Sequence, residues 1–189
     1  MTNSSQKTLS YIYAVIIVLV IVSITKRINT PSNYDIIITN GEVIDGSGSS
    51  SVYKDVGIIG NKIHKIGNLS SAESERYIDA EGLVVSPGFI DVHVHLDPIL
   101  RLSNSESHVR QGVTTSLGGP DGTSPWPFGE FLDTLSQVGV GMNIAYLVGH
   151  NTVRRNVMGL ENRAPSEEEL NKMERQISAG MDEGAYGIS

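Results

Sequence analysis

The chain contains no cysteine, and this absence excludes several kinds of chemistry at once. Without thiols there is no disulfide framework, no thiolate zinc site, no thiol nucleophile and no lipid-modified amino-terminal cysteine. Positive charge is also scarce: the net charge is −7, which argues against nucleic acid or an acidic surface as a partner. The 189 residues suffice for one or two domains with a hydrophobic core. Any metal site in this protein must use imidazole and carboxylate ligands.

The chain also lacks an apolar run of the about 20 residues that a full membrane span needs. Its apolar run Tyr11–Ile24 has 14 residues and is flanked by basic residues on both sides. That length is typical of the core of a secretory signal, but no small-x-small cleavage site follows. We therefore expect residues 1–29 to be either a signal peptide or an uncleaved membrane anchor at residues 11–24. The protein is then exported or membrane-anchored, outside the cytoplasm.

Residues 34–82 have the pattern of short strands joined by tight turns. Asn40-Gly41 separates two strand-like runs, and Gly60-Asn61 separates two more. Each dipeptide predicts a β-hairpin, and residues 77–80 add a further short strand. This part of the chain is predicted to be a small all-β segment.

Between residues 83 and 189 strands alternate with helices. A capping box of Ser166 and Glu169 opens the strongest helical pattern. Such alternation predicts right-handed βαβ units, a parallel sheet and chemistry at the carboxyl ends of the strands. The predicted strands cover residues 83–96, 113–117, 143–148 and the chain from 185 onward, and the predicted helices lie near 103–111, 128–138 and 166–183.

His93 and His95 stand one residue apart in the first of these strands. Because side chains alternate along a strand, Asp91, His93, His95 and Asp97 are predicted to share one face. Two neutral imidazoles on one face can bind a single metal ion. The alternative is a half-exposed strand whose polar side faces water. The apolar pair Phe89-Ile90 favours a buried strand, and hence the metal site.

Three further residues at strand ends are candidates for chemistry. Asp121 follows the second strand in a Pro-Asp-Gly sequence, which is also an ordinary turn signal. His150 follows the third strand, where a lone histidine is often structural. Arg154 lies close by, and its guanidinium matches the two oxygens of a substrate carboxylate, although a solvated arginine is the alternative.

Several motifs together resemble a known family. The segment Pro87-Gly-Phe-Ile-Asp-Val-His-Val-His95, following the β segment, resembles the start of a metal-dependent amidohydrolase barrel. The resemblance implies an α/β fold in which a small β-sandwich at residues 34–82 precedes residues 83–189. The latter would be the amino-terminal half of a (β/α)₈ TIM barrel, truncated here. The later motifs Gln111–Thr115, Gly149–Arg154, Val157–Gly159, Arg163–Leu170 and Gly184–Ser189 are similar to the D-aminoacylase (N-acyl-D-amino-acid deacylase) group.

That resemblance implies a zinc-dependent hydrolase, with one or two Zn²⁺ ions, acting on the linear amide of small N-acyl-D-amino acids. His93 and His95 would be metal ligands. Asp121 stands where the group usually has a metal-binding cysteine in Gly-Asn-Cys-Gly, and a carboxylate is also able to bind zinc. His150 matches a characteristic histidine of the group, and we expect it to bind substrate together with Arg154.

A (β/α)₈ barrel takes about 250 residues, and this chain reaches only the fourth strand. We therefore expect the general base beyond residue 189, a missing carboxy-terminal half as partner, and little or no activity of this chain alone. A dihydropyrimidinase-like hydrolase of cyclic amides is one alternative, although no lysine suited to carboxylation stands near the strand ends. A non-catalytic or degenerate fragment is another.

Overall fold

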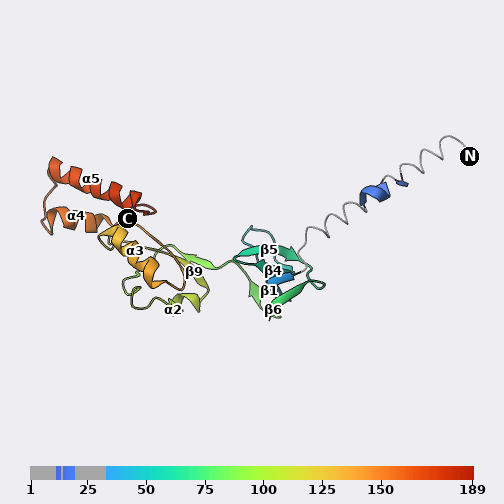
Figure 1. The fold of residues 1–189 in the computed structure, drawn as a ribbon. Helices are drawn as coiled ribbons and strands as arrows, with labels where there is room; N and C mark the ends of the chain where they lie inside the picture. Colours follow the sequence, from blue (N-terminus) through green and yellow to red (C-terminus); the bar gives the residue numbers. More distant parts are fainter. Residues whose placement is uncertain (1–11, 14, 20–32) are drawn as a thin grey trace, which may run out of the picture. The chain divides into compact units, whose positions relative to one another are not determined.

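The computed structural model describes residues 12–13, 15–19 and 33–189. The chain divides into two compact units, Met1–Pro87 and Gly88–Ser189 (Figure 1). Strands dominate the described part of the first unit, and strands alternate with helices in the second.

Two small sheets form the first unit. The four-stranded sheet has the order β5-β4-β1-β6, and its buried core consists of Tyr34, Ile37 and Leu69. The three-stranded sheet has the order β3-β2-β7. The strand bounds are Asn33–Thr39 (β1), Glu42–Val43 (β2), Val52–Tyr53 (β3), Asp55–Ile59 (β4), Lys62–Gly67 (β5), Glu73–Asp79 (β6) and Val84–Val85 (β7).

Of the two predicted hairpins, one is confirmed and the other is wrong. β4 and β5 pair antiparallel around Gly60-Asn61, as predicted. Across Asn40-Gly41, however, β1 pairs with β4 and β6, whereas β2 pairs with β3 and β7. The Asn40 side-chain amide donates to Asp79 Oδ1 at 2.9 Å instead of closing a hairpin. A Cβ on Gly41 would lie 2.5 Å from Val85 Cγ2, so this dipeptide carries the chain tightly from one sheet to the other.

The second unit contains a parallel sheet of order β10-β9-β8, which confirms the predicted α/β alternation. A parallel bridge between Val148 and Ile188 lies where the fourth strand is predicted. Phe128, Val148 and Val153 are fully buried in the core of this second unit. The bounds are Phe89–Asp91 (β8), Glu106–Val109 (α2), Val113–Gly118 (β9), Phe128–Val138 (α3), Asn143–Tyr146 (β10), His150–Met158 (α4) and Glu167–Asp182 (α5).

The predicted strand over residues 83–96 is wrong in extent and in burial. It is divided into β7 and β8, and β8 ends at Asp91, so that His93 and His95 follow the strand. Phe89 is 63% exposed and Ile90 66% exposed. The physical reason is position: β8 is the edge strand of its sheet and pairs only with β9 among the described strands. Apolar sequence alone does not distinguish such an edge from a buried strand.

The capping box that opens α5 is confirmed. Ser166 Oγ accepts a hydrogen bond from the Glu169 N–H, and the Glu169 carboxylate accepts one from the Ser166 N–H at 2.8 Å. Arg163 donates two further hydrogen bonds to the same carboxylate, at 2.6 and 2.7 Å. These contacts lower the pKa of Glu169 from 4.5 to about 2, and the hydrogen bonds from Arg163 are the largest cause.

In the described ranges, no helix is long and apolar enough to cross a membrane. The signal peptide or anchor predicted within residues 1–29 lies largely outside the described residues and stays a prediction.

We predict that the free energy of unfolding changes less with pH, in the acid range, in the Glu169→Gln variant than in the unsubstituted chain. The folded-state pKa is about 2, below the ordinary 4.5, so the carboxylate stabilises the fold above about pH 4.5 and this contribution is lost as the pH falls through about 2. The variant should therefore be less stable at neutral pH, and the difference should shrink toward pH 2. Urea unfolding across this range measures it, with Glu174→Gln on the same helix as the control. A difference that does not change with pH would contradict the prediction.

Candidate metal centre

His93, His95 and Asp121 come together at the carboxyl ends of two neighbouring parallel strands. The histidines follow β8 and Asp121 follows β9, and Asp91 at the end of β8 pairs with Ser116. Asp121 Oδ2 lies 3.3 Å from His93 Nε2 and 3.2 Å from His95 Nε2. One potential ligand atom from each residue lies within 4.8 Å of the others. The structure thus brings the three predicted ligands into one cluster.

A turn at the end of β8 directs the two histidines. The Asp91 carboxylate accepts a hydrogen bond from the His93 N–H at 3.1 Å, two residues further on. The two imidazole rings lie edge to face, with centroids 6.1 Å apart and an interplanar angle of 75°. The imidazoles therefore converge because of this turn and not because of the alternation of a strand.

Asp121 occupies the second position of the turn Pro120-Asp121-Gly122-Thr123, in which the Thr123 N–H donates to the Pro120 carbonyl at 3.2 Å, and φ is 56° at Asp121 and 76° at Gly122. Positive φ at both central residues is the pattern of a type I′ turn, and aspartate and glycine are among the few residue types that adopt it. Gly119 also has positive φ, and a Cβ there would lie 2.5 Å from the Leu147 carbonyl oxygen. The turn signal and the ligand role are compatible, because the turn carries the carboxylate to the imidazoles.

The three donors fit a zinc ion. Zinc takes imidazole nitrogen at 2.0–2.1 Å and carboxylate oxygen at 2.0–2.2 Å in tetrahedral geometry, which separates neighbouring ligand atoms by roughly 3.3–3.5 Å. The two distances to Asp121 Oδ2, 3.3 and 3.2 Å, are close to this separation. The side chains of His93, His95 and Asp121 are 63, 61 and 62% exposed, which leaves one side open to water and substrate. Three ligands and an open position are the pattern of a catalytic zinc site.

A pocket of about 280 Å³ adjoins this cluster. His95, Asp97, Gly119, Pro120 and Tyr146 are among its lining residues. Burial raises the pKa of the Tyr146 hydroxyl, and the charge of Asp97 raises it further. The hydroxyl therefore stays protonated at neutral pH and is able to donate a hydrogen bond into the pocket.

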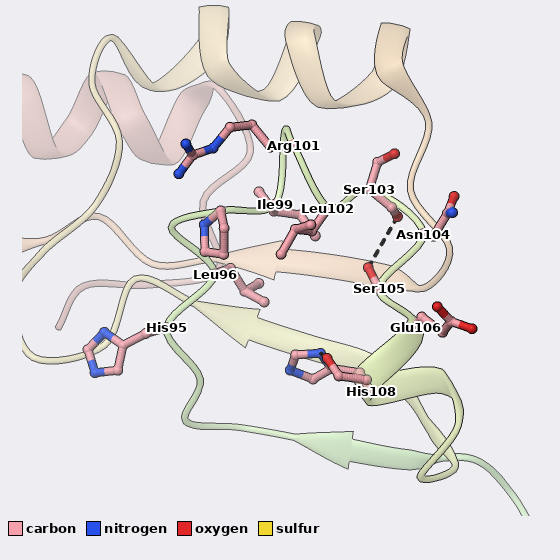
Figure 2. Close-up of a pocket in the computed structure, with 12 residues that line it drawn as sticks. His95, Leu96, Ile99, Arg101, Leu102, Ser103, Asn104, Ser105, Glu106 and His108 are labelled. Atoms are coloured by element: carbon pink, nitrogen blue, oxygen red, sulfur yellow. Dashed lines mark hydrogen bonds between the residues drawn. The ribbon is translucent and has the colours of Figure 1, made fainter.

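A second pocket, of about 370 Å³, lies between the segment that follows His95 and α2. Figure 2 shows that the His95 ring is directed away from the apolar side chains of Leu96, Ile99 and Leu102. His93 and Asp121 do not line this pocket. Of the three candidate ligands, this second pocket therefore touches His95 alone, and it does not lie where the three side chains meet.

The two predicted substrate-binding residues lie outside the three-residue cluster. His150 is the first residue of α4 and is exposed. Arg154 donates hydrogen bonds of 2.8 Å to the carbonyl oxygens of Glu161 and Arg163, and holds the segment that follows α4. Substrate binding by His150 and Arg154 stays a prediction.

Tyr146, Asn151 and Ser189 were given no role by the sequence pattern. Tyr146 lies at the end of β10 and faces the smaller pocket, and the other two contact the Asp121 turn. Their strand-end and loop positions are the only signal in the sequence, because their partners are distant along the chain.

Comparison with known proteins identifies relatives that match most of the chain. The model of the family described as "Amidohydrolase family" matches residues 76–189. A D-aminoacylase from Alcaligenes xylosoxydans xylosoxydans is 35% identical over 180 residues. A solved structure of a D-aminoacylase with a binuclear metal centre matches this chain with a TM-score of 0.78 at 34% identity. An N-acyl-D-glutamate deacylase from Bordetella bronchiseptica, solved with zinc and a phosphonate inhibitor, has a TM-score of 0.78 at 30% identity.

These matches cover most of this chain but less than two fifths of each relative. The share of this chain is 82% in all three, whereas the shares of the relatives are 37, 38 and 38%. The second unit thus has the α/β fold of the matching part of the solved structures.

We predict that Asp121→Ala weakens Zn²⁺ binding by more than about 100-fold, the upper end of the loss found when only an outer contact of a ligand is removed. Two imidazoles then remain of the three donors. Isothermal titration calorimetry measures the affinity. Asp133→Ala, an exposed position on α3, is the matched control. Unchanged affinity in Asp121→Ala would exclude this carboxylate as a ligand.

Proposed function

Because this chain belongs to the amidohydrolase family, we propose that it is the amino-terminal part of a zinc-dependent deacylase that hydrolyses the linear amide of N-acyl-D-amino acids. The single observation that carries the proposal is the approach of Asp121 Oδ2 to the Nε2 atoms of both His93 and His95. The similarity to a D-aminoacylase and to an N-acyl-D-glutamate deacylase supports the substrate class.

In this proposal His93 and His95 would hold the metal through Nε2, and Asp121 would hold it through Oδ2. Bound zinc lowers the pKa of its water to about 7 and polarises the amide carbonyl. The open side of the cluster admits the substrate, and the neighbouring Tyr146 hydroxyl offers a hydrogen bond. His150 and Arg154 bind the substrate, Arg154 through the carboxylate of the amino acid. For this, its guanidinium has to exchange its contacts with the carbonyls of Glu161 and Arg163.

The proposal also concerns the architecture and the proton acceptor. Residues 34–82 are a β-sandwich segment, and residues 83–189 are the first half of a (β/α)₈ barrel. Phe89, Ile90 and Val92 on and after the edge strand β8 are 63, 66 and 68% exposed, as expected where further strands of a barrel would pack. The general base and any further ligands come from the remainder of the barrel, in accord with the 37% of the D-aminoacylase that this chain covers.

We predict that this chain alone releases no D-amino acid from an N-acetyl-D-amino acid, and that it does so when fused to the carboxy-terminal remainder of the similar D-aminoacylase. The activity should depend on added Zn²⁺, because the remainder completes the ligand set and supplies the proton acceptor. A coupled D-amino acid oxidase assay measures release.

Two controls make this test specific. The His93→Ala/His95→Ala fusion should lose at least about 10³-fold in rate, as expected when the metal that activates water is lost. The N-acetyl-L-amino acid tests the stereochemical preference. A fusion that opens dihydrouracil but leaves N-acetyl-D-amino acids intact would replace the proposal with a cyclic-amide hydrolase.

A further inference from the structure

The turn that carries Asp121 is also held by a side chain from a distant part of the chain. Within the turn itself the Thr123 N–H donates to the Pro120 carbonyl at 3.2 Å, as in an ordinary β-turn. Here the Gly122 N–H donates to Ser189 Oγ at 3.1 Å, and the Ser189 hydroxyl donates to the Gly119 carbonyl at 2.6 Å. The hydroxyl of Ser189 thus links Gly119, which precedes the turn, to Gly122 within it, in addition to the direct bond of the turn.

Ser189 is itself fixed by its backbone. Its N–H donates to the Val148 carbonyl at 3.0 Å, and its carbonyl accepts from the His150 N–H at 3.0 Å. Val148 also forms the parallel bridge with Ile188. The half-buried Ser189 hydroxyl therefore has a defined position before it contacts the turn, which makes it an effective support for the turn.

The first turn of α4 contacts the same turn from another direction. Asn151 Nδ2 donates to the Asp121 carbonyl at 3.2 Å, and the Thr152 N–H donates to the Gly122 carbonyl at 3.1 Å. A Cβ on Gly122 would lie 2.5 Å from Asn151 Nδ2, so this close approach needs a glycine. Asn151 and Ser189 together hold both sides of the left-handed residue that carries the carboxylate.

We propose that Ser189, assisted by Asn151, is a positioning residue that keeps the Asp121 carboxylate in reach of a metal ion bound by His93 and His95. The inference rests on the metal site of the proposed function and adds a residue that sets its geometry. Without the Ser189 hydroxyl the turn loses the link between Gly119 and Gly122. The bond between the Thr123 N–H and the Pro120 carbonyl remains, but the turn is no longer fixed to Ser189, and the carboxylate moves away from the imidazoles.

The experiment is a Co²⁺ titration of the full 189-residue chain, followed by visible absorption. Co²⁺ accepts the nitrogen and oxygen ligands that zinc uses, and its visible bands report the number and geometry of its ligands. The absence of cysteine keeps thiolate bands out of the spectrum. The variants are Ser189→Ala, Ser189→Thr and Asn151→Ala. Ser136→Ala is the matched control, since that hydroxyl donates to the Leu132 carbonyl within α3, away from the Asp121 turn.

We expect Ser189→Ala to weaken Co²⁺ binding about tenfold and to change the spectrum at saturating Co²⁺, as expected for the loss of a group that orients a ligand. Ser189→Thr, which keeps the hydroxyl, should restore both. Asn151→Ala should weaken binding by a smaller factor, and Ser136→Ala should leave it unchanged.

The contrary outcomes are distinguishable. A Ser189→Ala chain that melts at a lower temperature but keeps the affinity and spectrum of the unsubstituted chain overturns the inference and leaves the metal site standing. If circular dichroism shows that the Ser189→Ala chain does not fold, the Asn151→Ala variant provides the test. An unchanged Co²⁺ affinity of the Asn151→Ala chain then overturns the inference. An unsubstituted chain that takes up no Co²⁺ overturns the metal site of the proposed function, and the inference with it.

Discussion

The parallel pairing of β8 with β9 is the constraint on which the candidate metal centre depends. Parallel neighbours end at the same edge of a sheet, so the segments that follow them leave side by side. One segment contributes His93 and His95 and the other contributes Asp121. The distances between them are short because each segment turns at once, the first through the Asp91 carboxylate and the second through the Pro120–Thr123 turn. The sheet places the segments, and these local turns direct the side chains.

This division explains how three residues that lie close together were predicted from an incorrect strand. The alternation argument placed His93 and His95 on a strand, but β8 ends at Asp91. The rule that chemistry follows strand ends does not depend on that detail, and it located all three candidate ligands. The helices α3 and α5 were predicted closely because their apolar spacing and, for α5, the Ser166 capping box are local signals.

Other features have no local signal. The helix α4 begins after Gly149 with no side-chain cap among the described residues. Its first N–H groups donate to the carbonyls of Ser189 and Gly122, which are distant in sequence. The Asn40-Gly41 dipeptide misled for the same reason, because the partners of β1 and β2 are decided by contacts elsewhere in the chain. Sequence patterns predicted what a segment does by itself and failed where a distant segment supplied the hydrogen-bond partner.

The hydroxyl bridge at the Asp121 turn has a consequence for the order of folding. Ser189 closes a loop of 67 residues when it meets Gly122, and 70 when it meets Gly119. Contacts between residues so far apart form late, because the chain must first be ordered between them. The two imidazoles, two residues apart, can be oriented early by their own local turn. In the proposed metal site, the two imidazoles of a nascent chain would therefore be oriented before the carboxylate reaches its final position.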